Sequence, residues 1–293
     1  MRYQANPQIN MVMLARRVQP QNEELKSARI HRAAVRARME ASFDVSRLVP
    51  IGSHARGTAI RSFSDVDLLV VLRRNEAKWG GSMVSSATLL DRVRDDLRAR
   101  FVHTDIRRDQ QAAVVGFAAG QQSLDVVPAI FRRFDRGRPA YFIPDGQGNW
   151  METSPEAHDR FFAAADERSG GKLKKVVQLL KWWKFSRAQE FPIQSFHVDM
   201  LMASSDVCVG VKPYTHCLYQ AFKLLADREC RGLQDPVGIA GVIYAAQTDP
   251  QWEAIRTAVG YALDHAREAV AAEAVRDFEE ANRQWSIVFN GDY

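Results

Sequence analysis

The chain has few cysteines and no long apolar run. Its 293 residues include only three cysteines, Cys208, Cys217 and Cys230, and no CxxC or HxxxH spacing of the kind that binds zinc. No secretory signal is visible, and no stretch reaches the roughly 18 apolar residues of a membrane span. These absences predict a cytoplasmic protein without a membrane segment, and they favour buried or surface thiols over zinc ligands.

Internal repeats, low-complexity tracts and a large excess of one charge are missing as well. Lys and Arg number 40 against 35 Asp and Glu, for a net charge of +5. With 46% hydrophobic and 26% charged residues, the composition is that of a globular protein, and the length allows one large domain or two lobes. A mildly basic balance suits an anionic ligand, either nucleotides or nucleic acid, and does not choose between them.

The most informative stretch runs from Gly52 to Leu72 and reads GSHARGTAIRSFSDVDLLVVL. Two aspartates, Asp65 and Asp67, stand at the start of an apolar run that predicts a strand. Side chains two residues apart in a strand point to the same side, so these carboxylates can share a divalent cation such as Mg²⁺. The Gly-Ser turn at Ser53 can offer N–H groups and a hydroxyl to a phosphate. Metal next to phosphate is the machinery of phosphoryl or nucleotidyl transfer.

A third aspartate, Asp125, lies in the apolar segment Ser123–Ile130. We predict a strand there, antiparallel to the strand of Asp67, and Pro128 places it at a sheet edge or ends it. A lone carboxylate among apolar neighbours requires a partner, and a metal ion is a good one. A single D-x-D is common in loops, so the prediction of a two-metal site depends on this third carboxylate and on the upstream turns.

The remainder of the chain divides into a mixed first part and a helical second part. Apolar patterns predict an α+β lobe of residues 1–165, which includes an N-terminal bracing helix, and a helical lobe of residues 166–293. A short loop leads to Ser195, which opens one further helix. The predicted helices cover residues 22–43, 87–100, 172–188, 214–226, 252–267 and 273–289, and the predicted strands 66–72, 101–108, 112–119, 123–130 and 141–143.

Several motifs resemble one known superfamily in their order along the chain. GSHARGT followed by SDVD resembles the signature of the DNA polymerase β-type nucleotidyltransferases. LDVVPA, VVQLLKWWK, PIQSFHVDML and a closing W-x-x-x-F narrow the resemblance to the cGAS/DncV-like nucleotidyltransferases (CD-NTases) of bacterial antiphage signalling. The resemblance implies a polymerase β-like core of mixed sheet and helices, a C-terminal helical lobe of the oligoadenylate-synthetase type, and a central cleft.

The resemblance assigns the first half of the site to five residues. Asp65, Asp67 and Asp125 would bind two Mg²⁺ ions, with Mn²⁺ as an alternative, and would be catalytic. Gly52 and Ser53 would hold the triphosphate of the donor nucleotide. All five would therefore act on the phosphates rather than on the base.

The second half of the site would come from the helical part. Lys181 would reach the phosphates, Ser195 would donate to the γ-phosphate, and Phe196 would stack on the base. The alternatives are a solvated helix lysine for Lys181 and a core position for Phe196. The chain departs from the family at Asp199, where members often have Glu. It also lacks a zinc-ribbon insertion, so activation by double-stranded DNA in the manner of animal cGAS is not expected.

The resemblance predicts an enzyme that makes a cyclic di- or trinucleotide from ATP, GTP or both, with UTP as a further candidate, in CBASS defence. A linear transferase of the oligoadenylate or tRNA-tailing type is the alternative. A catalytically inactive nucleotide-binding module is a third reading, against which the intact set of aspartates argues. We expect a monomer that does not bind membranes, and a regulatory protein partner stays open.

Overall fold

The computed structural model describes residues 6–117, 122–187 and 192–293, and the contacts along the chain divide into two units. The sheet unit comprises Pro20–Arg160, and the helical unit comprises Phe161–Tyr293 together with Met1–Gln19. The predicted lobes, 1–165 and 166–293, had instead grouped the first residues with the sheet. The boundary after Arg160 falls within helix α5 (Pro155–Arg168).

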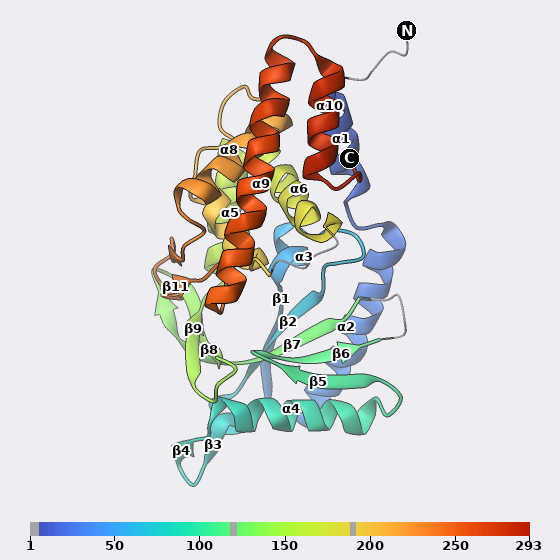
Figure 1. Cartoon of the computed structure of the whole chain (residues 1–293). Coiled ribbons are helices and arrows are strands. Elements are labelled where there is room, and N and C mark those ends of the chain that lie inside the picture. Colours follow the sequence, from blue (N-terminus) through green and yellow to red (C-terminus); the bar gives the residue numbers. More distant parts are fainter. Residues whose placement is uncertain (1–5, 118–121, 188–191) are drawn as a thin grey trace. The chain divides into compact units, whose positions relative to one another are not determined.

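The sheet unit is built on a seven-stranded mixed sheet (Figure 1). Its two central strands, β2 and β7, run parallel, and every other pair of strands in the sheet is antiparallel among the residues that the structure describes. The predicted α+β class with a mixed sheet is therefore confirmed. The strands are β1 (Val45–Ile51), β2 (Val66–Leu72), β5 (Asp105–Asp109), β6 (Ala112–Gly116), β7 (Leu124–Asp135), β8 (Arg138–Pro144) and β9 (Trp150–Thr153).

Two predictions for the strand of Asp125 were wrong. Strand β7 is parallel to β2, because the chain between them is long enough for a crossover that contains helix α4 (Ser86–Arg100) and the β5–β6 hairpin. Pro128 neither ends β7 nor lies at an edge, since it pairs with β2. On the other side of β7, pairing with β6 stops at Val126 and pairing with β8 starts at Ile130. Pro128 lies in this gap between ladders, where a missing N–H is tolerated.

The alternation of side chains along β2 decides which residues are buried under helices. Val66, Leu68, Val70 and Leu72 pack in a core with apolar residues of helices α2 (Asn22–Ser42) and α4. The intervening residues Leu69 and Val71 belong to a separate cluster with Val127 and Ala129 of β7. Because alternate side chains share a face, Asp67 lies on the side of Leu69 and Val71, away from α2 and α4.

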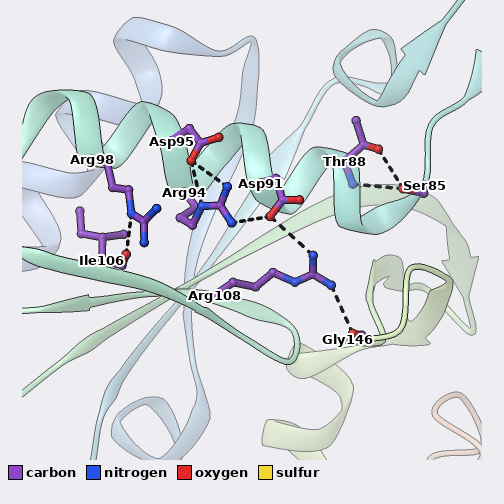
Figure 2. A network of polar contacts seen from close by, with 9 residues as sticks. All are labelled: Ser85, Thr88, Asp91, Arg94, Asp95, Arg98, Ile106, Arg108 and Gly146. Atoms are coloured by element: carbon purple, nitrogen blue, oxygen red, sulfur yellow. Dashed lines mark hydrogen bonds and ion pairs between the residues drawn. The ribbon is translucent and has the colours of Figure 1, made fainter.

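A polar network ties α4 to the hairpin that borders β7 (Figure 2). Arg98 donates to the carbonyl oxygen of Ile106 in β5 at 2.7 Å. Arg108, also in β5, lies 3.5 Å from the carboxylate of Asp91 in α4 and donates to the carbonyl oxygen of Gly146 at 3.3 Å. These contacts hold one side of the sheet in place, and they are made mainly by half-exposed side chains.

The helical unit packs around buried aromatic side chains, among them Trp183, Phe222, Trp285 and Phe289. Its helices confirm the predicted helical character (Figure 1). Residue 188 of one predicted helix and residues 118 and 119 of one predicted strand lie outside the described residues. The helices wholly or partly in this unit are α1 (Pro7–Arg17), α5, α6 (Lys172–Ser186), α7 (Ser195–Ala203), α8 (Tyr214–Asp227), α9 (Asp249–Ala274) and α10 (Phe278–Val288), with a hairpin of β10 (Leu233–Gln234) and β11 (Val242–Ile243).

Three short elements complete the sheet unit: helix α3 (Gly52–Arg56), the 3₁₀ turn η1 (Arg74–Ala77), and a hairpin of β3 (Lys78–Trp79) and β4 (Ser82–Met83). The three cysteines, all in the helical unit, are buried free thiols. Among the described helices, none combines the length and the apolar character that crossing a membrane requires.

Candidate functional site

Asp67 and Asp125 lie directly opposite each other on the parallel strands β2 and β7. Both are half-buried, and Oδ1 of Asp125 is buried without a hydrogen-bond partner among the described residues. Burial, together with the negative charges of Asp67 and Asp65, raises the pKa of Asp125 to about 8, against an opposing effect of Arg107. The fold thus places acidic groups together, and at Asp125 the negative charges outweigh the positive charge of Arg107.

Asp65 precedes β2 and is exposed. Its Oδ1 accepts a short hydrogen bond from the hydroxyl of Ser123, and the N–H of Val66 donates to the carbonyl oxygen of Ser123 at 3.0 Å. Asp65 is therefore held against Ser123, which is two residues before Asp125 in the chain. We call Asp65, Asp67 and Asp125 the carboxylate cluster.

The carboxylate cluster fits a hard divalent cation. An orphaned carboxylate oxygen next to two further carboxylates is the donor set that Mg²⁺ prefers. Within the described ranges, no three His, Cys, Asp or Glu side chains, the carboxylate cluster included, are arranged so that they could hold a metal ion by themselves. Magnesium sites in enzymes commonly use one or two carboxylates and complete the shell with water and substrate phosphates, so a complete protein cage is not required.

Gly52 explains why a glycine precedes the serine of the predicted turn. Its φ of +73° is left-handed, and a Cβ there would lie 1.9 Å from Oδ2 of Asp67. The backbone of Gly52 is thus packed directly against a carboxylate of the cluster. Ser53 follows in the first turn of α3, and its carbonyl oxygen accepts from the N–H groups of Thr58 and Ala59 at 2.9 and 3.1 Å. The phosphate-binding role of both residues stays a prediction.

Three supporting residues were missed by the sequence reasoning. Ser123 holds Asp65, as described above. Arg56, the last residue of α3, is 7% exposed and lies 3.1 Å from a carboxylate oxygen of Asp159 on α5. A buried arginine inside the GSHARGT motif was a signal that a partner is required. Its partner could not be found, because Asp159 is far away in sequence and has no distinguishing pattern.

Lys181, Ser195 and Phe196 all lie in the helical unit, on helices α6 and α7. Lys181 lies on α6 and is only 3% exposed, with its Nζ 2.7 Å from Oδ1 of Asp199 on α7. The alternative of a solvated lysine is therefore wrong, whereas contact of Lys181 with phosphates stays a prediction. Ser195 and Phe196 form the start of α7 and are half-buried. Stacking by Phe196 also stays a prediction.

The start of α7 is held by other parts of the same unit. The N–H of Gln194 donates to the carbonyl oxygen of Ala245 at 3.0 Å. Lys184 donates to the carbonyl oxygen of Ile193 at 3.0 Å, and Nδ1 of His197 lies 3.0 Å from the carbonyl oxygen of Ile243. Ser195 and Phe196 are therefore presented on an anchored turn.

Comparison with known proteins gives a consistent family. A model described as SMODS, the Second Messenger Oligonucleotide or Dinucleotide Synthetase domain, matches residues 8–165. The Cyclic AMP-AMP-AMP synthase of Escherichia coli (strain MS 115-1) is 28% identical over 196 residues, which is 64% of this chain and only 59% of that relative. The Probable cyclic nucleotide synthase IK1_05630 of Bacillus cereus is 20% identical over 276 residues, covering 84% of this chain and 82% of the relative.

Solved structures agree in fold. The structure of E. coli MS115-1 CdnC with ATP matches with a TM-score of 0.76 at 22% identity, covering 99% of both chains. The Vibrio cholerae DncV cyclic AMP-GMP synthase with a linear intermediate matches with a TM-score of 0.64 at 16% identity, covering 83% of this chain and 68% of that one. The predicted resemblance to the CD-NTases is thereby confirmed at the level of fold.

Proposed function

Because the chain belongs to the Second Messenger Oligonucleotide or Dinucleotide Synthetase family, we propose that it joins nucleoside triphosphates into a cyclic di- or trinucleotide. The relatives named Cyclic AMP-AMP-AMP synthase and CBASS oligonucleotide cyclase CdnC support ATP as one substrate and CBASS defence as the setting. GTP and UTP are the further candidates. Base choice and ring size are decided by the product analysis below.

The observation that carries this proposal is that Asp67 and Asp125 are opposite each other in the register of two parallel strands. One carboxylate oxygen of Asp125 is also buried without a hydrogen-bond partner among the described residues. Mg²⁺ or Mn²⁺ bound there would neutralise phosphate charge and lower the pKa of the attacking hydroxyl. Asp65, Asp67 and Asp125 would hold two such ions between them, with Asp65 oriented by Ser123. The close approach of Gly52 limits the positions that the carboxylate of Asp67 can take.

The residues of the predicted triphosphate site keep their proposed roles. Gly52 and Ser53 would offer backbone N–H groups and a hydroxyl to the phosphates. Lys181 would supply a positive charge and Ser195 a hydroxyl, and Phe196 would stack on the base. These roles are supported by the contacts that fix the residues: the backbone of Ser53 is hydrogen-bonded, Lys181 is paired with Asp199, and the turn before Ser195 is hydrogen-bonded at Ile193 and Gln194.

The proposal is tested by incubating the purified chain with all four NTPs and Mg²⁺ or Mn²⁺. We expect a phosphatase-resistant product that mass spectrometry identifies. Asp67→Asn should lower its rate of formation at least about a hundredfold, the scale on which loss of one preorganised electrostatic group acts. The matched control is Asp95→Asn on α4, whose carboxylate is exposed and pairs with Arg94; it should retain activity.

Two outcomes would contradict the proposal. A product with a phosphatase-sensitive end would identify a linear transferase instead. Folded protein that binds ATP with Mg²⁺ in calorimetry, yet forms no product under any mixture, would indicate a nucleotide-binding module.

A regulatory protein partner is proposed on the basis of one relative. The solved E. coli MS115-1 CdnC is in a complex with HORMA-deltaN. The assay is therefore run with this chain alone and with an added HORMA-type protein. A faster rate of product formation on addition would support regulation by such a partner, and an equal rate would contradict it.

A further inference from the structure

Lys181 and Asp199 form a buried ion pair between α6 and α7. The ammonium lies 2.7 Å from the carboxylate oxygen, and the two side chains are 3% and 0% exposed. Lysine and aspartate are rarely buried to this degree unless they are paired. The pair is therefore a built feature of the helical unit, and its role requires an explanation.

Stability alone does not explain the pair. Removing two charges from water is costly, and two well-packed apolar side chains of similar volume commonly serve a core at least as well. A lysine also loses much rotamer freedom when it is held in one place. The pair is understandable if a positive charge is needed at this place, because the carboxylate then keeps the ammonium charged and fixed.

The pair lies close to the accessible start of α7. Ser195 and Asp199 are four residues apart on this helix, so their Cβ atoms are about 5–6 Å apart on one face. The carboxylate that holds the ammonium of Lys181 is consequently about one helical turn from Ser195 along α7. Ser195 is half-buried, and its turn is anchored through Gln194 and Ile193. A phosphate that accepts from Ser195 would therefore meet the field of a preset positive charge.

We propose that Asp199 is a positioning residue, whose carboxylate holds the ammonium of Lys181 beside Ser195 for the donor triphosphate. The inference rests on the proposed function, because it takes Lys181 as a phosphate ligand. Asp199 itself would not touch the nucleotide. It acts by restricting the positions of the ammonium before the nucleotide arrives, which lowers the cost of ordering the lysine during binding.

The test measures binding of a non-hydrolysable ATP analogue with Mg²⁺ by calorimetry, so that it does not depend on turnover. Asp199→Asn removes the negative charge with little change in shape. We expect its Kd for the analogue to rise about tenfold or more, as for the loss of other residues that orient a binding group. Asp199→Glu keeps the charge and should retain most of the affinity, which also covers the case in which the Asn variant does not fold.

A matched control is an acid that pairs with a different lysine of α6. Asp166 is a buried carboxylate of α5 whose oxygen lies 3.3 Å from Nζ of Lys174 on α6, two helical turns from Lys181. Asp166→Asn should leave the Kd unchanged. It reports the effect of losing a buried acid that does not contact Lys181.

Two results would overturn the positioning role. An unchanged Kd in Asp199→Asn, with the wild type binding normally, would mean that the pair only supports the fold. Tighter binding in Asp199→Asn would mean that the carboxylate competes with the triphosphate for Lys181. If the folded wild type binds no nucleotide, the proposed function fails together with the inference. If the wild type binds but makes no cyclic product, the positioning role can still hold while the proposed product is wrong.

Discussion

The carboxylate cluster and the Lys181–Asp199 pair differ in how far their charges are balanced by opposite charges. In the cluster, Asp125 has a buried oxygen without a hydrogen-bond partner among the described residues, and the charges of Asp67 and Asp65 act on it more strongly than that of Arg107. In the pair, each charge is buried almost completely and matched by the opposite charge at 2.7 Å. Asp125 therefore lies in an excess of negative charge, whereas Asp199 is matched by the charge of Lys181.

This difference indicates where a ligand is needed. A group of carboxylates with an excess of negative charge is unfavourable until protons or cations neutralise it, so the cluster indicates cation binding. A compensated pair has no such need, and its contribution is to fix a position. Charge balance, rather than burial alone, therefore separates a ligand-binding role from a positioning role.

The largest effect is expected when the pair is broken. Lys181→Met leaves the carboxylate of Asp199 buried without its counter-charge and should lower the free energy of unfolding by about 3–5 kcal/mol. Adding Asp199→Leu to this variant removes both charges and should restore much of the loss. Urea denaturation followed by circular dichroism measures both variants. If the single variant is as stable as the double variant, the pair does not compensate charge as described.

The cluster should respond to a cation instead. Mg²⁺ at about a hundred times its Kd should stabilise the protein by about 2.7 kcal/mol, because it binds the folded state only. Removing the cation with EDTA should reverse this gain, and Asp67→Asn should abolish it. Thermal denaturation with and without Mg²⁺ gives the measurement. Equal gains in the wild type and in Asp67→Asn would place the cation elsewhere.

A substitution at Gly52 connects the glycine turn to the cluster. Gly52→Ala combines a left-handed φ with a Cβ that meets the carboxylate of Asp67, and it should cost about 1–3 kcal/mol or more. Gly137→Ala is the matched control, since it has a φ of +76° and open space around the new Cβ. The difference in melting temperature between the two variants isolates the close approach. No difference would mean that Asp67 moves away freely.

The last prediction is the dependence of stability on pH in the cation-free protein. The pKa of Asp125 is raised to about 8, so between about pH 4 and pH 8 the folded state holds a proton that the unfolded state has released. Stability from this group should therefore fall as pH rises through that window, which melting temperatures measured from pH 4 to pH 8 would show. Asp125→Asn should remove this part of the slope. An unchanged slope would show that Asp125 ionises normally.

Much of the fold followed from local patterns. The strand Val66–Leu72 and the helix from Asn22 were predicted with bounds close to those observed. Both patterns, a continuous apolar run and a helical spacing of apolar residues, depend only on residues that are near one another in the chain. The parallel direction of β7 and the position of Pro128 were predicted wrongly. Both depend on the neighbours that a strand acquires in the sheet, which a single sequence does not specify.

The sequence by itself determined the kinds of elements, the three aspartates and the glycine turn, since these depend on residue type and spacing along one segment. Only the tertiary structure decided that Asp67 and Asp125 are opposite in register, that Gly52 touches Asp67, and that Lys181 pairs with Asp199. The physical reason is that register, close approach and charge compensation arise between segments far apart in the chain. These contacts are set by how the strands and helices pack, rather than by any local pattern.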